Sequence, residues 1–485
     1  AAVGGAISVL TGDGTSTSGA LYLQTANSAL GNALSGLVHI STGTTLSGNS
    51  GSVTLASGVA SGGRGGDITI AAAGPLTVDQ DVTNFGSGET TLTAAETVIP
   101  ATGQLTFLEL QQDGINNVDG LSGAVTVTTS PDGNHVYVAS LLDNAVAVFS
   151  RNASTGLLTF VESQRDGINS VDGLDDAKGI AVSPDGNHVY AVASGTDNSI
   201  AVFSRNSVTG ALAFVETLKD GVNSVDGLQG ARSVTISPDG NHVYVASDTE
   251  SAVAVFSRNS TSGSLSFVEV LKDGVNNVDG IGTARSLTIS PDGGHVYVAA
   301  AVDDAVAVFS RNASSGELTF VEFLQNGTQG ISGLDGAFGV TISPDGGHAY
   351  VASFDDDAIT VFSRNSVTGA LTFVESIQNS SPAVNGLDGA RSVSVSPDGQ
   401  HVYVVSEVDN SVAVFRRDSL TGTLTFIESR GDSEPGVDGL SMAFGVTVSP
   451  DNEHVYVASF GDNALTAFSR DTTSSFGSPL NNLTV

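Results

Sequence analysis

The chain has 485 residues, a formal net charge of −34, no Cys, no Trp and 59 Gly. The acidic surplus repels phosphate backbones, and no apolar run approaches the roughly 18–20 residues of a membrane-spanning helix, so we expect neither nucleic-acid binding nor a membrane span. The lack of cysteine excludes disulfides, a thiol nucleophile and a cysteine zinc site, and the glycine content favours short strands and tight turns over helices.

Residues 1–100 are rich in Gly, Ser, Thr and Ala and contain short alternating segments that start at regularly spaced glycines. These glycines, about 15 residues apart, are Gly5, Gly19, Gly36, Gly51 and Gly66. Short strands at such a period predict the stacked rungs of a parallel β-solenoid, with a low-complexity linker as the alternative. The chain starts at Ala1 with neither Met nor a signal-like segment, which we interpret as a processed form.

From about residue 101 onward one unit recurs seven times, marked by the motif SPDGxHxY, whose last copy has Asn in place of Gly. The marker serines, 53 or 54 residues apart, are Ser130, Ser183, Ser237, Ser290, Ser343, Ser396 and Ser449. In the third unit we expect strands at Ser233–Ile236, His242–Ala246, Ala252–Phe256 and Leu265–Val270. Four strands per unit, repeated seven times, predict an all-β, seven-bladed β-propeller over residues 101–473.

The two ends of the repeat array indicate how the ring closes. A lone strand, Gln104–Leu110, precedes the first unit, whereas the last unit has three strands and no fourth. We therefore expect the N-terminal strand to complete the last blade, because closure removes the exposed edges of an open array. Residues 474–485 are then left over as a C-terminal tail, which we expect to be able to add a strand to a neighbouring molecule.

The repeated motifs resemble those of a known family. SPDGxHxYV, AVxVFSR and TGxLTFVE recur in almost every unit over residues 101–471. With these motifs the array resembles the lactonase-like seven-bladed propellers of the 6-phosphogluconolactonase and YVTN surface-repeat type. The resemblance implies a propeller fold, in a family that includes both sugar lactonases and secreted repeat proteins. Residues 1–100 are similar in composition to the β-solenoid repeats of bacterial surface proteins of the filamentous-haemagglutinin type.

Seven histidines and seven Phe-Ser-Arg or Phe-Arg-Arg elements repeat at fixed positions in the unit. The histidines are His135, His188, His242, His295, His348, His401 and His454. The arginines are Arg151, Arg205, Arg258, Arg311, Arg364 and Arg470, with the pair Arg416 and Arg417 in the sixth unit. Ring symmetry keeps equivalent positions too far apart to share a metal ion, so we expect structural histidines and arginines that pair between neighbouring blades.

Acidic residues gather in the links that enter each blade. Five links carry two aspartates, located 17 and 11 residues before the marker serine. These are Asp113 and Asp119, Asp166 and Asp172, Asp220 and Asp226, Asp273 and Asp279, and Asp432 and Asp438. The loops between the second and third strands add further acids on the same face. Carboxylates suit Ca²⁺, so calcium is the one cofactor that we expect here; capping of turns by Asx hydrogen bonds is the alternative.

One position breaks the symmetry of the ring. Five residues before the marker serines, the units carry Val125, Lys178, Arg232, Arg285, Phe338, Arg391 and Phe444. We expect the four cations to converge on the mouth of the central channel beside the two phenylalanines. Guanidinium groups placed there could bind a carboxylate or a phosphate of a ligand. Pairing of the cations with neighbouring loop aspartates is the alternative.

Two main functional hypotheses follow. The open end of a solenoid stack needs a cover, which favours a non-enzymatic extracellular or cell-surface protein with a structural or adhesive role. Such a protein would assemble with copies of itself through its solenoid and termini, and its propeller would display or bind a glycan or another cell-surface component. The alternative is a lactonase-like hydrolase or sugar-acid binder at the channel mouth. A calcium-dependent glycan-binding module is a third hypothesis, and the structural protein is our main expectation.

Overall fold

The computed structural model describes residues 91–92, 98–99, 101–432, 434–472, 475–476 and 483–484. Its secondary structure in these residues consists of β-strands, and the chain divides into two compact units, Ala1–Ala94 with Asn481–Val485, and Ala95–Leu480. The solenoid expected for residues 1–100 lies outside the described residues, apart from β1 (Thr91–Leu92) and β2 (Val98–Ile99). A search of the described part finds no helix with the length and hydropathy to cross a membrane.

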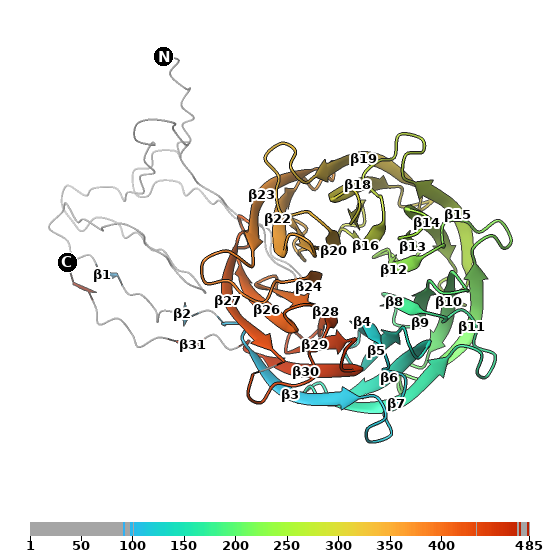
Figure 1. Cartoon of the computed structure of the whole chain (residues 1–485), viewed down its shortest axis with the longest axis horizontal. Helices are drawn as coiled ribbons and strands as arrows, with labels where there is room; N and C mark the ends of the chain where they lie inside the picture. Colours follow the sequence, from blue (N-terminus) through green and yellow to red (C-terminus); the bar gives the residue numbers. More distant parts are fainter. Residues whose placement is uncertain are drawn as a thin grey trace, which may run out of the picture. The chain divides into compact units, whose positions relative to one another are not determined.

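Seven four-stranded antiparallel sheets form a ring around a central channel, as Figure 1 shows. The innermost strands of blades 1 to 7 are β4 (Ala124–Thr129), β8 (Ala177–Val182), β12 (Ala231–Ile236), β16 (Ala284–Ile289), β20 (Ala337–Ile342), β24 (Ala390–Val395) and β28 (Ala443–Val448). The second strands are β5 (His135–Ser140), β9 (His188–Ala193), β13 (His242–Ser247), β17 (His295–Ala300), β21 (His348–Ser353), β25 (His401–Ser406) and β29 (His454–Ser459). The seven-bladed propeller predicted from the repeat is confirmed.

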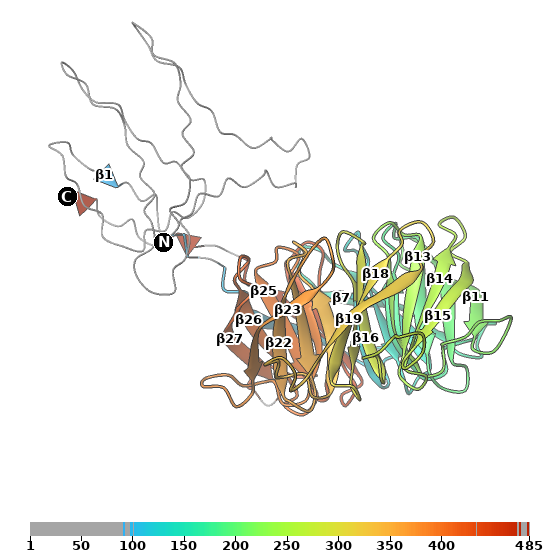
Figure 2. The same ribbon diagram turned by 90° about the horizontal axis from the view of Figure 1, so that it is seen from above.

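The third and fourth strands complete each blade toward the rim. The third strands are β6 (Ala145–Arg151), β10 (Ser199–Arg205), β14 (Ala252–Arg258), β18 (Ala305–Arg311), β22 (Ala358–Arg364), β26 (Ser411–Arg417) and β30 (Ala464–Arg470). The outermost strands of blades 1 to 6 are β7 (Leu158–Arg165), β11 (Leu212–Lys219), β15 (Leu265–Lys272), β19 (Leu318–Gln325), β23 (Leu371–Gln378) and β27 (Leu424–Gly431). Figure 2 views the same ring from its edge, where several of these outermost strands cross the rim.

Blade 7 is completed by a strand from the other end of the propeller. β3 (Leu105–Gln112) pairs antiparallel with β30, and in Figure 1 this blue strand lies beside the red one. The predicted closure is therefore confirmed. In the C-terminal tail, β31 (Ser475–Phe476) pairs with β2 and β32 (Leu483–Thr484) pairs with β1 of the same chain. The rest of the tail lies outside the described residues.

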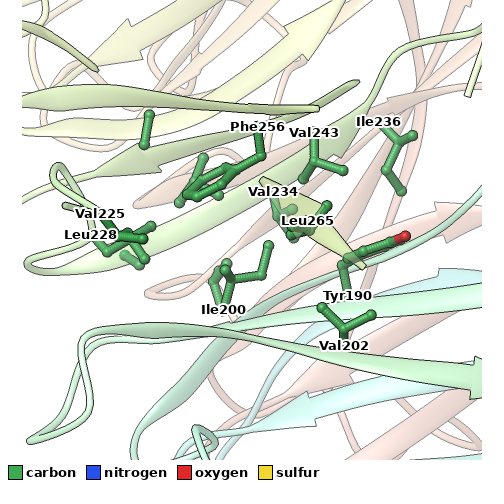
Figure 3. Close-up of a cluster of buried hydrophobic side chains, with 14 residues drawn as sticks. Tyr190, Ile200, Val202, Val225, Leu228, Val234, Ile236, Val243, Phe256 and Leu265 are labelled. Atoms are coloured by element: carbon green, nitrogen blue, oxygen red, sulfur yellow. The ribbon is translucent and has the colours of Figure 1, made fainter. Parts of the chain in front are cut away.

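The hydrophobic core is divided among the seven junctions between adjacent blades. The second and third strands are buried on both faces, which explains why their sequences are almost continuously apolar. Between blades 2 and 3, Ile200 and Val202 pack with Val234, Val243 and Phe256 (Figure 3). Each blade therefore depends on its neighbours to cover its apolar faces.

The repeated arginines, histidines and tyrosines join adjacent blades at the turns between the first and second strands. At the junction of blades 1 and 2, Arg205 donates from Nε to the Tyr137 hydroxyl at 2.7 Å and from Nη2 to His135 Nδ1 at 2.7 Å. Nη2 also forms an ion pair with Asp132 at 2.8 Å. Arg205 of blade 2 thus binds three side chains of blade 1, and Tyr137 donates back to the carbonyl of Gly210 in blade 2 at 2.9 Å.

An equivalent arginine–tyrosine bond occurs at all seven junctions, including the one that closes the ring through Arg151 and Tyr456. Both expectations about these residues are confirmed: the histidines are structural and the arginines pair between blades. In the sixth unit the pairing residue is Arg417, whereas Arg416 is exposed. Burial and the adjacent Arg205 lower the pKa of His135, so its imidazole stays neutral beside the guanidinium.

Candidate active site at the channel mouth

Each innermost strand begins with a β-bulge that leaves one residue without a cross-strand partner. In blade 1, Ala124 pairs with Ser140 and Thr126 with Ala139, so Val125 is the extra residue. The same register shift occurs in the other six blades. The bulge residues are Val125, Lys178, Arg232, Arg285, Phe338, Arg391 and Phe444, and all seven line a central cavity of about 140 Å³. Since bulges redirect side chains, this backbone feature gathers the predicted cations in one place.

A second ring of side chains lies directly beyond the second strands, eleven residues after each marker serine. Its members are Leu141, Ser194, Asp248, Ala301, Phe354, Glu407 and Phe460. In four blades the two rings match in chemistry: Arg232 pairs with Asp248, Arg391 with Glu407, Phe338 with Phe354, and Phe444 with Phe460. The sequence analysis missed this ring, although the same blade-by-blade comparison at this position would have found it.

The acids of the second ring hold three of the four predicted cations. Asp248 Oδ2 accepts from Nη1 of Arg285 at 2.9 Å and from Nη1 of Arg232 at 3.4 Å, which ties blades 3 and 4 together. Glu407 Oε2 lies 2.8 Å from Arg391 Nη1. The arginines therefore do pair with loop acids, but with acids of the second-to-third-strand loops and not with the aspartates of the links.

The guanidinium groups are crowded and poorly solvated. Burial, followed by the charges of Arg285 and Arg391, lowers the pKa of Arg232 to about 9. Burial lowers the pKa of Arg391 to about 10, against the opposing effect of Glu407. Both groups remain cationic at neutral pH. The cluster therefore concentrates positive charge in a weakly screened site, where it interacts strongly with any anion that enters.

Phe338 lies among three guanidinium groups. The distances from its ring centroid to Cζ are 4.7 Å for Arg232, 5.4 Å for Arg285 and 4.5 Å for Arg391. Arg391 also lies 3.6 Å from the centroid of Phe444. Cation–π attraction of roughly 0.5–2 kcal/mol per pair offsets part of the mutual repulsion. Two buried donors of the described residues still lack a hydrogen-bond acceptor, Nε of Arg285 and Nε of Arg391.

A second pocket, of about 320 Å³, adjoins the channel between blades 4 and 6. Its lining includes Ala301, Asp355 and Glu407, and it shares Arg285, Phe338 and Arg391 with the central cavity. Ala301 occupies the ring position at which blades 3, 5 and 6 have Asp, Phe and Glu. Its short side chain therefore leaves a gap in the second ring at blade 4. Arg285 and Arg391 line both the central cavity and the adjoining pocket.

The predicted acidic links form five clusters in which two link aspartates meet an acid of the second-to-third-strand loop, with carboxylate oxygens within 4.8 Å of one another. The clusters are Asp113, Asp119 and Asp143; Asp166, Asp172 and Asp197; Asp220, Asp226 and Glu250; Asp273, Asp279 and Asp303; and Asp432, Asp438 and Asp462. The first aspartate of each link also caps its turn, as Asp113 Oδ1 does by accepting from the Leu121 amide at 3.0 Å. This bond spans eight residues and is not the local Asx hydrogen bond of the alternative, which stays a prediction.

Three of these clusters already contain a cation from the adjacent outermost strand. Arg165 pairs with Asp119 and Asp143, Lys219 with Asp172 and Asp197, and Lys272 with Asp226 and Glu250. The clusters around Asp273 and Asp462 show no such ion pair among the described residues. Burial and then the neighbouring carboxylates raise the pKa of both Asp273 and Asp462, as expected for acids without a counter-ion.

The closed ring of four-stranded sheets defines the chain as a seven-bladed β-propeller with one asymmetric channel mouth. The sequence pattern of the family described as "Lactonase, 7-bladed beta-propeller" matches residues 108–271, 274–382 and 378–476, and the chain belongs to this family. A 6-phosphogluconolactonase of Klebsiella pneumoniae (strain 342) is 25% identical over 337 residues, which cover 68% of this chain and 92% of the relative.

Solved structures agree on the fold. The periplasmic gluconolactonase PpgL of Pseudomonas aeruginosa is 22% identical with a TM-score of 0.53, and the match covers 68% of this chain and 94% of that one. Hydrazine synthase of Kuenenia stuttgartiensis is 18% identical with a TM-score of 0.54, covering 75% of this chain and 100% of that one. Proteins with different chemistry thus share this scaffold, and the activity must be argued from the site.

These comparisons correct our main functional expectation. The prediction of a non-enzymatic structural or adhesive protein is wrong, because the curated relatives matched over nearly their whole length are named as 6-phosphogluconolactonases, which are enzymes. That expectation depended on the open end of a solenoid, a segment outside the described residues. The comparisons favour the alternative hypothesis of a lactonase-like hydrolase.

Proposed function

We propose that this protein is a lactone hydrolase that binds an anionic sugar lactone at the channel mouth. The observation that carries the proposal is the charge of the two rings: four cations face two acids, Asp248 and Glu407, in a chain whose net charge is −34. A local excess of positive charge inside an acidic protein favours a ligand of opposite charge. The name of the Klebsiella relative makes a phosphorylated gluconolactone the first substrate to test.

Hydrolysis of a lactone requires a water molecule to attack the carbonyl carbon, and negative charge develops on the carbonyl oxygen. Arg285 and Arg391 line both the channel and the adjoining pocket and have donors without acceptors, so they are suited to stabilise this oxyanion. Asp248 fixes Arg285 from one side, and Glu407 fixes Arg391 from the other. The faces of Phe338 and Phe444 supply apolar walls for the carbon skeleton of the sugar.

The direct test is hydrolysis of 6-phosphoglucono-1,5-lactone, followed by acid release and corrected for the spontaneous reaction. We expect the wild type to accelerate hydrolysis, and Arg285→Gln or Arg391→Gln to lower kcat/KM by about 100-fold or more, the usual loss when one oxyanion donor is removed. Arg416→Gln is the matched control, because Arg416 is an exposed arginine of the third strand. A wild type that never exceeds the spontaneous rate would refute the proposal.

A further inference from the structure

Lys178 differs from the other lysines of the chain. It is the bulge residue of β8, and it lines the central cavity together with Arg232 and Arg285. Its ammonium group makes no ion pair with a residue of the described part, whereas Lys219 and Lys272 each bind two carboxylates. The sequence contains these three lysines and no others, so each can be followed individually.

The surroundings of Lys178 disfavour its protonated form. The charged groups that face it are Arg232 of β12, Arg285 of β16, Asp248 of the loop after β13, and Asp176 just before β8. Burial lowers the pKa of Lys178, Arg232 and Arg285 lower it further, and the two aspartates oppose this change without reversing it. Desolvation and a neighbouring cation are the usual means of activating a lysine amine in an enzyme.

The pKa values of the other two lysines shift in the opposite direction, because carboxylates contact their ammonium groups. Hydrogen bonds from Lys219 to Asp172 and Asp197 raise its pKa despite partial burial, and bonds to Asp226 and Glu250 do the same for Lys272. The pKa of Lys178 is therefore lowered, whereas those of the other two lysines are raised. Lys219 and Lys272 provide internal controls for any measurement on Lys178.

Few groups at the channel mouth are available to accept a proton. Asp248 is shared by two arginines, and Glu407 is paired with Arg391, so both carboxylates are already engaged in ion pairs. Asp355 lines the adjoining pocket but is exposed to solvent. Among the described residues that line the central cavity, Lys178 is the one lysine, and its Nζ makes no ion pair.

We propose that the neutral amine of Lys178 accepts a proton from the water molecule that attacks the lactone carbonyl, an assignment that rests on the proposed function. As the water oxygen bonds to the carbonyl carbon, its proton passes to Nζ. The ring C–O bond of the tetrahedral intermediate then breaks, and the departing alkoxide takes the proton back from the ammonium. The amine is regenerated, and the net reaction consumes one water to give the open hydroxy acid.

The variant Lys178→Arg tests this role without removing the positive charge. Arginine stays protonated, so it can still attract an anionic substrate but cannot accept the proton. We expect kcat to fall by about 100-fold or more, with KM for the phosphorylated lactone changed less than about threefold. Lys178→Gln loses the charge as well, and its KM should also rise.

The pH profile provides a readout that a structural role would not affect. Because the neutral amine acts, the wild-type kcat should increase with pH through the pKa of Lys178, which lies below that of an ordinary lysine. This increase of kcat with pH should disappear in Lys178→Arg. Trace labelling with acetic anhydride over the same pH range should modify Lys178 at lower pH than Lys219 and Lys272.

Three outcomes would overturn the assignment. One is an increase of kcat with pH that persists in Lys178→Arg. The second is an increase that is lost in Asp355→Asn instead, which would make Asp355 the base. The third is an amide adduct on Lys178 after turnover, detected by intact mass, which would make this amine a nucleophile. If the wild type does not hydrolyse the lactone at all, the proposed function itself fails, and that result is distinct from an active enzyme in which Lys178 is dispensable.

Discussion

The blade junctions depend on glycines as much as on the repeated arginines. Gly210 has a φ of +78°, and a Cβ built at this position would collide with Cδ2 of His135. Glycine is therefore required twice over, for its left-handed backbone and for the space that the imidazole occupies. The carbonyl of the same residue accepts the Tyr137 hydroxyl, so the glycine, histidine and tyrosine form one unit of the junction.

This geometry gives a matched pair of substitutions. Gly210→Ala should lower the free energy of unfolding by on the order of 2 kcal/mol more than Gly221→Ala does, because Gly221 has a similar φ of +71° but nothing within 4 Å of the added Cβ. Urea unfolding of both variants measures the difference. Equal losses would mean that the packing of His135 does not contribute to the junction.

Single residues also show what the sequence could and could not reveal about the site. Lys178 and Arg232 could be found because the marker motif fixes their register, and comparison between blades then exposes the broken symmetry. Asp248 and Glu407 could not be distinguished from the many other acids in the loops. Their importance comes from contacts across the channel mouth, such as the bridge from Asp248 to Arg285, which a linear sequence does not display.

At the scale of elements, the last residue of each outermost strand sets the chemistry of the adjacent acidic cluster. β7, β11 and β15 end in Arg165, Lys219 and Lys272, and each of these cations pairs with its cluster. β19 and β3 end in Gln325 and Gln112, whose amides donate to the backbone carbonyls of Asp303 and Asp462. Neutral glutamine leaves the carboxylates of these two clusters without a counter-charge.

We therefore expect calcium at only two of the five acidic clusters, those around Asp273 and Asp462, and this stays a prediction. Calcium should raise the melting temperature of the wild type relative to a chelator, since binding to the folded state stabilises it. Asp279→Asn should reduce this increase, because its cluster has no internal cation, whereas Asp172→Asn should not, because Lys219 already occupies that cluster. A melting temperature that is the same with calcium and with chelator would contradict the prediction.

At the scale of the whole molecule, the repeat made the fold predictable. A unit that recurs every 53 or 54 residues specifies its own neighbours, so the strand order, the closure by β3 and the position of the bulge residues all follow from one period. The first 100 residues have a characteristic composition but no comparably specific motif. Their solenoid, self-association through the termini, a glycan partner and an extracellular location stay predictions.

The error in the main functional expectation has a physical explanation. An uncovered solenoid end concerns only how molecules assemble, and it gives no information on the function of the propeller. The chemistry of a symmetric ring lies in its deviations from symmetry, and here the largest deviation is at the bulge residues, where Arg285 and Arg391 replace what is Val125 in blade 1. The asymmetry of the bulge residues is therefore a better indicator of function than the solenoid end, and it favours an enzyme.

The central claim is that this broken symmetry creates one anion site per chain at the channel mouth. Calorimetric titration with 6-phosphogluconate, the product of the proposed reaction, measures it directly. We expect one ligand per chain, with an affinity that falls as salt increases and is lost in the double variant Arg285→Gln, Arg391→Gln but not in Arg416→Gln. Several equivalent sites per chain, or binding that survives the double variant, would contradict it.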